Sequence, residues 1–168
     1  MAGLPGTGKS TLARTIAQRM NGVVLDKDTV RAALFPEPLI EYSTAQDDFV
    51  IHVILTTAEK ILRSDPQLAV FIDGRPFSRK YQIDAAVTYA ERIGTPWRVV
   101  ECVCSEELAL RRLQEDQGQH IAKNRDANLY RAVKTKFEEI TRPKLVVQTE
   151  LALEMNLEKV EEYLRSTK

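Results

Sequence analysis

Gly3-Leu4-Pro5-Gly6-Thr7-Gly8-Lys9-Ser10 is the stretch of sequence that decides the fold. It matches G-x-x-x-x-G-K-[ST], the phosphate-binding loop known as the P-loop or Walker A motif. Its glycines let the backbone curl so that several N–H groups point into one concavity. The helix expected after the loop adds the N–H groups of its own first turn. The sequence therefore predicts a phosphate-binding loop over residues 3–11.

Two side chains of the loop have separate predicted tasks. Lys9 would reach the β- and γ-phosphates of ATP, and the hydroxyl of Ser10 would coordinate Mg²⁺. ATP and Mg²⁺ are thus the expected cofactors. The residues expected to contact the nucleotide are Gly3, Pro5, Gly6, Thr7, Gly8, Lys9, Ser10 and Thr11.

Helix and strand patterns alternate along the chain, which is typical of an α/β fold with a parallel sheet. Apolar runs predict strands at 22–26, 68–73, 97–104 and 145–149. The chain has 168 residues, of which 43% are hydrophobic and 29% charged. These values fit a single globular domain over residues 1–168 and exclude a disordered chain.

The longest helix is expected over residues 43–63, and a closing helix over residues 157–164, behind Asn156. The apolar side chains of the longest helix predict which face is buried. That predicted face consists of Phe49, Val53, Ala58, Ile61 and Leu62.

The strand that normally precedes a P-loop, in the middle of the sheet, is missing from the sequence. Only Met1 and Ala2 come before Gly3. We expect the printed sequence to begin downstream of the natural start, because a lost central strand would cost backbone pairing and core burial. A fold that tolerates a very short or substituted central strand is the alternative. The first strand is therefore predicted to be missing or truncated.

Acidic and basic side chains follow two of the predicted strands. Asp73 ends the apolar run 68–73 in the Walker B pattern, so it would orient Mg²⁺ or hold Ser10. Ligands of open parallel sheets gather at the carboxyl ends of the strands. Asp28, after the strand 22–26, could therefore accept the proton of an acceptor hydroxyl. A helix N-cap role for Asp28 is the alternative.

Two arginines accompany these acids. Arg31 lies three residues after Asp28 on the same helical face, where it could bind the acceptor or the transferring phosphoryl group. Arg75 follows Asp73 at the same sheet edge and is expected to contact the substrate. Solvated surface arginines are the alternative for both positions.

A lid is predicted over about residues 111–126, because a polar stretch without periodicity is flanked there by cations. Such a segment can close over ATP, exclude water and stabilise developing charge. Arg112 and Arg125 are the lid residues expected to act in catalysis, with Arg111 and Lys123 as competing candidates.

The charge balance limits the classes of partner. Lys and Arg together number 24, as do Asp and Glu, so the formal net charge is zero. That balance argues against a general polyanion binder. A small-molecule acceptor is therefore favoured over a nucleic acid, which remains an alternative. No apolar run reaches the roughly 18 residues of a membrane span, and Cys102 and Cys104 form no zinc or disulfide pattern. A cytoplasmic location is expected.

The sequence resembles the small P-loop kinases related to polynucleotide kinase, adenylylsulfate kinase and the zeta-toxin and chloramphenicol phosphotransferase branch. The similarity extends over nearly the whole chain. It implies a three-layer α/β/α fold of the nucleoside-monophosphate-kinase type, ATP with Mg²⁺ as phosphoryl donor, and an alcohol as acceptor. Its most specific segments are residues 3–11, 25–31, 71–74, 124–130 and 142–149.

The resemblance also implies roles for single residues. Asp28 falls where polynucleotide kinases place the general base, and Arg31 where they place an arginine for the acceptor phosphate. Arg112 falls on the first lid arginine. Asp116 stands in place of the second lid arginine, so Arg125 or Lys123 would have to replace it.

Three functions follow from these patterns. The leading hypothesis is an ATP-dependent kinase that transfers the γ-phosphoryl group to a hydroxyl of a small molecule. A nucleoside monophosphate kinase is the second, because the segment 73–76 resembles the Asp-Gly-Phe-Pro-Arg of adenylate kinases. The third is a non-catalytic switch or scaffold that binds ATP, suggested by the missing strand. The acceptor and the oligomeric state have no signature in the sequence.

Overall fold

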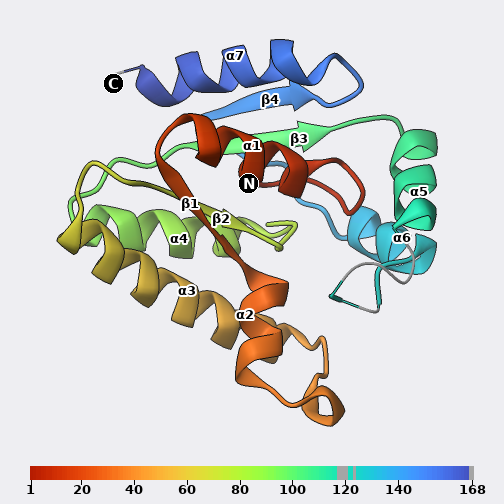
Figure 1. The fold of residues 1–168 in the computed structure, drawn as a ribbon. Helices are drawn as coiled ribbons and strands as arrows, with labels where there is room; N and C mark the ends of the chain where they lie inside the picture. The colour runs from red at the N-terminus through yellow and green to blue at the C-terminus, as the bar shows by residue number, and fades with distance from the viewer. Residues whose placement is uncertain (117–120, 123, 167–168) are drawn as a thin grey trace.

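The protein is described by a computed structural model, in which residues 1–116, 121–122 and 124–166 are placed (Figure 1). Helices and parallel strands alternate along the chain, as the sequence predicts. The strands are β1 (Gly22–Asp26), β2 (Ala69–Asp73), β3 (Val99–Val103) and β4 (Lys144–Gln148). The helices are α1 (Lys9–Arg19), α2 (Lys27–Leu34), the short 3₁₀ helix η1 (Glu37–Leu39), α3 (Thr44–Ser64), α4 (Lys80–Arg92), α5 (Glu106–Glu115), α6 (Ala127–Thr135) and α7 (Leu153–Arg165).

The strands form two parallel pairs. β1 pairs with β2 in a register that sets Asp26 opposite Asp73, so that both carboxylates lie at the same end of this pair. β3 pairs with β4, and Val103 lies opposite Gln148 at the end of that pair. Because all four strands run in parallel, their carboxyl ends and the loops that follow them can build one shared site.

Met1 and Ala2 connect the two pairs. The Met1 nitrogen donates a hydrogen bond to Ile72 O of β2 at 2.9 Å. Ala2 N donates to Val100 O, and Ala2 O accepts from Cys102 N, both at 2.8 Å on β3. Two residues thus occupy the place of a central strand between β2 and β3, which agrees with the predicted truncation of the first strand. They lead directly into the P-loop.

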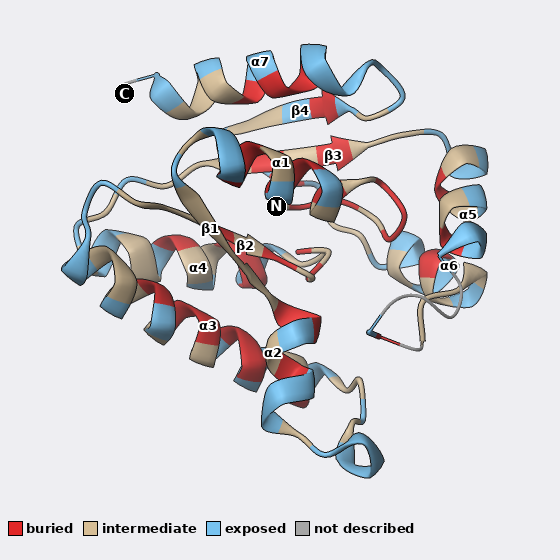
Figure 2. Ribbon diagram, in the orientation of Figure 1, coloured by how far each residue is buried: buried red, intermediate tan, exposed pale blue. Residues whose placement is uncertain are grey.

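Helices cover both faces of the strands and give three layers (Figure 1). On one face, Leu12 and Ile16 of α1 and Val160 of α7 pack with Phe71 and Val100. On the other face, α4 packs with Ala2 and α3 packs against Ile72. Phe71 and Ile72 point to opposite faces because successive residues of a strand alternate. Buried residues lie along α1, α3 and α7 in Figure 2.

The predicted buried face of the longest helix is only partly correct: Ala58 is buried, Val53, Ile61 and Leu62 are half-buried, and Phe49 is exposed. Phe49 is 51% exposed, and instead of entering the core it packs edge-on against Phe35, with ring centroids 5.9 Å apart. The position of α2 beside α3 decides which face turns inward, and the apolar side chains of α3 alone do not show this. The residues of α3 that are buried are Gln46, Val50, Ile51, Ile54, Leu55 and Ala58.

The closing helix α7 also differs from its prediction, because it begins at Leu153 rather than at residue 157. Asn156 is buried within the helix instead of preceding it. Its Nδ2 donates to Gln148 O at 3.0 Å and to Leu151 O at 3.4 Å, which ties the start of α7 to the end of β4. Among the residues that the structure describes, no helix is long and apolar enough to cross a membrane.

Candidate active site

The P-loop connects Ala2 to α1 and packs closely against neighbouring backbone. Gly3 has a φ of 130° and Gly6 a φ of 77°, values that side-chain-bearing residues rarely adopt. A Cβ atom would lie 2.2 Å from Cys102 O at Gly3 and 2.4 Å from Ala109 O at Gly6. Both glycines are therefore required by the close approach of the loop to β3 and α5 as well as by its curvature.

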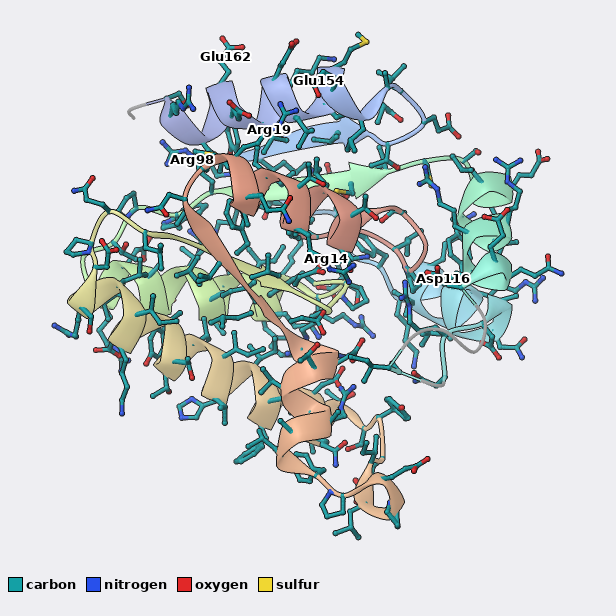
Figure 3. All side chains as sticks on the ribbon, in the orientation of Figure 1. Arg14, Arg19, Arg98, Asp116, Glu154 and Glu162 are labelled. Carbon is teal, nitrogen blue, oxygen red and sulfur yellow. The ribbon has the colours of Figure 1, made fainter. Side chains whose placement is uncertain are left out.

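A cavity of about 900 Å³ opens over the P-loop. We call one part of its wall the P-loop side, formed by residues 5–6 and 8–11 with Arg112, Arg125 and Thr149. The other part is the α2 side, formed by Lys27, Asp28, Tyr42, Asp47 and Arg75. Arg14 of α1 and Asp116 at the end of α5 also line the cavity and are labelled in Figure 3.

Lys9 and Arg112 on the P-loop side bond to neutral oxygen atoms. Lys9 Nζ donates to Leu4 O at 2.7 Å. Arg112 donates to Thr149 Oγ1 at 3.0 Å and to Thr149 O at 2.9 Å. Burial lowers the pKa of Lys9 to about 8, although the carboxylate of Asp73 partly offsets this effect. Water is thus largely excluded from a charge that lacks a direct ionic partner among the described residues.

Arg125 completes the P-loop side from the segment before α6. Its guanidinium contributes to the lowered pKa of Lys9, so the two cations lie close enough to repel each other. Its ion pair with Asp116 is 3.8 Å long, and the Asp116 side chain is 56% exposed. Arg111, by contrast, is 63% exposed, pairs with Glu115 at 4.0 Å, and is not part of the cavity wall. Lys123 lies outside the described residues.

Asp73 ends β2 with a carboxylate that is almost completely buried, at 1% exposure. Its Oδ1 atom has no hydrogen-bond partner among the described residues. A buried, unpaired carboxylate oxygen is costly unless a cation or a donor occupies the site beside it. Oxygen donors such as this carboxylate and the Ser10 hydroxyl are those that Mg²⁺ prefers. Both groups therefore have the donor chemistry that a magnesium ion requires, and Ser10 also lines the cavity.

The start of α2 separates the roles of two aspartates. Asp26 is the N-cap of this helix, and its Oδ1 accepts a hydrogen bond from Thr29 N at 2.8 Å. The alternative of a capping role for Asp28 is thereby excluded. Asp28 instead accepts from Arg31 Nη1 at 2.6 Å through its Oδ1 atom. This hydrogen bond from Arg31 engages Oδ1 and not Oδ2.

Two aspartates at the start of α3 pair with cations of the α2 side, and neither was predicted from the sequence. Only Asp47 lines the cavity. Asp47 receives hydrogen bonds from Lys27 Nζ on both of its oxygens, at 2.9 and 3.0 Å, and a further one from Arg31. Asp48 accepts from Arg75 Nη2 at 2.5 Å. Burial lowers the pKa of Lys27 to about 8. Acidic residues are common in the first turn of a helix, so this pair gave no separate signal.

The two arginines that were predicted to contact substrate differ in position. Arg75 lines the cavity, whereas Arg31 does not. Only 2% of the Arg31 side chain is exposed, and its guanidinium is held between Asp28 and Asp47, 5.0 Å from the centre of the Tyr42 ring. In this structure Arg31 therefore contacts Asp28 and Asp47 without lining the cavity itself. Its predicted contact with acceptor or phosphoryl group remains a prediction.

The fold and its glycine-rich loop define a P-loop protein of the α/β class. The chain belongs to the AAA_33 family of AAA domains, whose family model matches residues 1–140. No curated protein matches the chain in sequence.

Solved structures share this fold at low sequence identity. The structure of APE1195 superposes with a TM-score of 0.76 at 21% identity, covering 98% of this chain and 92% of that one. The Mycobacterium tuberculosis APS kinase CysC, in complex with AMPPNP and APS, gives 0.72 at 18% identity, covering 98% and 95%. A putative kinase from Chloroflexus aurantiacus gives 0.72 at 21% identity, covering 96% and 94%.

Proposed function

We propose that the protein is an ATP-dependent kinase that transfers the γ-phosphoryl group of ATP to a hydroxyl group of a small molecule. One observation carries the proposal: the cavity that contains the P-loop also contains Asp28, a carboxylate not used as a helix cap. A binding loop alone would suit many P-loop proteins. A positioned base beside it is what transfer to an alcohol requires. The APS kinase and the putative kinase that share this fold support the same class of reaction.

The P-loop side would bind the nucleotide. Backbone N–H groups of the loop and the first turn of α1 would surround the phosphates, because both present unpaired donors. Lys9 would exchange Leu4 O for phosphate oxygens, and this gain of an anionic partner favours the charged amine. Arg112 and Arg125 would stabilise the charge that develops on the transferring group. Arg111, which does not line the cavity, is not needed for this arrangement.

Magnesium would be held by the Ser10 hydroxyl and by Asp73, directly or through water. When bound, Mg²⁺ would supply charge neutralisation on the β- and γ-phosphate oxygens. The unpaired Oδ1 of Asp73 supports this assignment, because it leaves one buried acceptor atom available.

Asp28 would act as the general base. Its Oδ1 is fixed by Arg31, while Oδ2 can accept the proton of the acceptor hydroxyl. The hydroxyl oxygen then forms a bond to the γ-phosphorus as the bond to the ADP oxygen breaks, and the proton stays on Asp28. Arg31 would hold the carboxylate in the orientation needed for this step.

The test is a screen with ATP labelled on the γ-phosphate against alcohols, nucleosides and nucleoside monophosphates. We expect transfer to a hydroxyl acceptor, a loss of about 100-fold or more in Asp28→Asn, and unchanged ADP binding in that variant. Asp65→Asn, an exposed aspartate after α3, is the matched control and keeps full activity. Full transfer by Asp28→Asn would exclude the base assignment.

The same screen separates the two other functions. Transfer only to nucleoside monophosphates would favour the monophosphate kinase. If ATP binds but is neither hydrolysed nor used with any acceptor, the protein is a nucleotide-binding switch or scaffold, and the kinase proposal fails.

A further inference from the structure

The α2 side of the cavity is rich in cations, yet each one is paired with a carboxylate. Lys27 donates to both oxygens of Asp47. Arg75 donates to Asp48 at 2.5 Å. Arg31 is shared between Asp28 and Asp47. Counting Arg31 and Asp48, which lie next to this wall but outside the cavity lining, three cations pair with three carboxylates here, so their formal charges cancel. Asp26 adds a further carboxylate to the lining.

The P-loop side is built differently. The hydrogen bonds of Lys9 and Arg112 to described residues go to a backbone carbonyl and to the oxygens of Thr149. An arriving phosphate can replace these neutral partners with no carboxylate to displace. Cations that are bonded to neutral oxygens suit a polyphosphate, whereas cations already paired with carboxylates suit an uncharged ligand.

An anionic group on the α2 side would have to break existing ion pairs. The side chains of Lys27 and Arg75, the two cations that line this wall, are 8% and 4% exposed, so water screens them weakly. Separating a carboxylate from a buried cation costs free energy. If the carboxylate stays in place, the incoming anion lies beside it and the two repel each other. A hydroxyl group avoids both costs, because a carboxylate oxygen has several acceptor positions and can take a further O–H donor.

We propose that the acceptor is an uncharged, hydroxyl-rich molecule of the sugar or polyol class, with no phosphate, sulfate or carboxylate near the reacting hydroxyl. Its hydroxyls would donate to Asp47 beside Asp28. Thr44 and Ser78, which line the same cavity, add hydroxyl groups that can donate or accept. This inference rests on the proposed function, because it describes the acceptor of that reaction.

The test measures anion binding and does not depend on activity. Protein saturated with ADP, so that the P-loop side is occupied, is titrated with inorganic sulfate and separately with AMP by calorimetry. For the unmodified protein we expect no binding of either anion at concentrations below about 10 mM. A dissociation constant above this value corresponds to very weak binding. Asp48→Asn frees Arg75 and should tighten sulfate binding at least about tenfold. Asp48 is 46% exposed, so this variant is expected to fold.

Two results would overturn the inference: sulfate or AMP binding to the ADP-loaded unmodified protein at about 1 mM or tighter, or no gain of sulfate binding in Asp48→Asn. Asp65→Asn is the matched control and should behave as the unmodified protein does. A melting curve confirms that each variant is folded before titration.

A second measurement uses acceptor pairs that differ by one phosphate: glucose and glucose 6-phosphate, glycerol and glycerol 3-phosphate, adenosine and AMP. Transfer to the uncharged members supports the inference, and transfer confined to the phosphorylated members overturns it. Absence of transfer to every acceptor would count against the proposed function alone, and the anion titration would still decide the inference.

Discussion

The two sides of the cavity hold their cations in opposite ways. On the P-loop side, Lys9 bonds to a backbone carbonyl and Arg112 to Thr149, so both charges are available to an anion. On the α2 side, Lys27 and Arg75 are already bound to Asp47 and Asp48. Lysine and arginine are thus available to an anion on one side and neutralised on the other. The partner of each cation therefore indicates which ligand the site can take.

The largest expected effect is on the P-loop side. Lys9→Met keeps the buried aliphatic chain but removes the only lysine charge of the loop. We expect phosphoryl transfer to fall at least about 100-fold, because this charge acts in a site where water is largely excluded. The measurement is ATP turnover with any acceptor found in the screen. Lys60→Ala, an exposed lysine on α3, is the control, and equal losses in both variants would contradict the assignment.

A matched pair of glycines tests how closely the P-loop is packed. Gly6 and Gly94 have similar φ values of 77° and 68°, but a Cβ at Gly94 has no atom within 4 Å. Gly94→Ala should cost about 1 kcal/mol of unfolding free energy, from backbone strain alone. Gly6→Ala should cost about 2 kcal/mol more, since its Cβ meets Ala109 O. Denaturant unfolding measures both, and equal costs would show that the loop has room.

On the α2 side, Asp47→Asn should lower the free energy of unfolding by about 2 kcal/mol. It leaves Lys27 and Arg31 buried with one anionic partner fewer, and the cost is below that of a fully buried pair because Asp47 is 21% exposed. Glu154→Gln is the control, because it breaks the surface pair with Arg19 between α1 and α7 (Figure 3). That pair should contribute far less, since water screens it. An equal loss in both variants would mean that the network adds no stability.

A more gradual expected effect is a pH dependence of ADP affinity that distinguishes the two sides. Lys9 and Lys27 both have a pKa lowered to about 8 by burial. ADP phosphates raise the pKa of Lys9, so binding above pH 8 requires uptake of a proton, and ADP affinity should fall by up to about tenfold per pH unit. Titrations without magnesium from pH 7 to 10 measure this slope. Lys9→Met should remove the slope and Lys27→Met should keep it, and the reverse result would contradict the comparison.

Much of the P-loop side was predictable because its signals are local. The loop, Lys9 and Ser10 lie within one short segment, and Asp73 ends an apolar strand. Arg112 and Arg125 line the cavity, whereas residues 117–120 and 123 of the predicted lid lie outside the described residues. The predicted roles of these residues in binding and transfer remain predictions. Their positions are what the structure adds.

The α2 side was only half predictable. Asp28 and Arg31 are three residues apart on one helix, and their direct bond follows from that spacing. Asp47 and Asp48, however, reach Lys27 and Arg75 only because α3 packs beside α2 and the end of β2. The same packing explains why Phe49 lies outside the core, contrary to its prediction: a helix with apolar residues on several sides can be buried on more than one of them.

The sequence by itself determined the P-loop, the alternating α/β pattern and the aspartates that end or follow the strands, because these depend on backbone conformation and short-range spacing. Tertiary structure alone decided which cations are neutralised, how Met1 and Ala2 fill the centre of the sheet, and where α3 is buried. The physical reason is that an ion pair between distant segments is set by distances of a few ångströms across the fold, and the order of residues along the chain does not encode those distances locally.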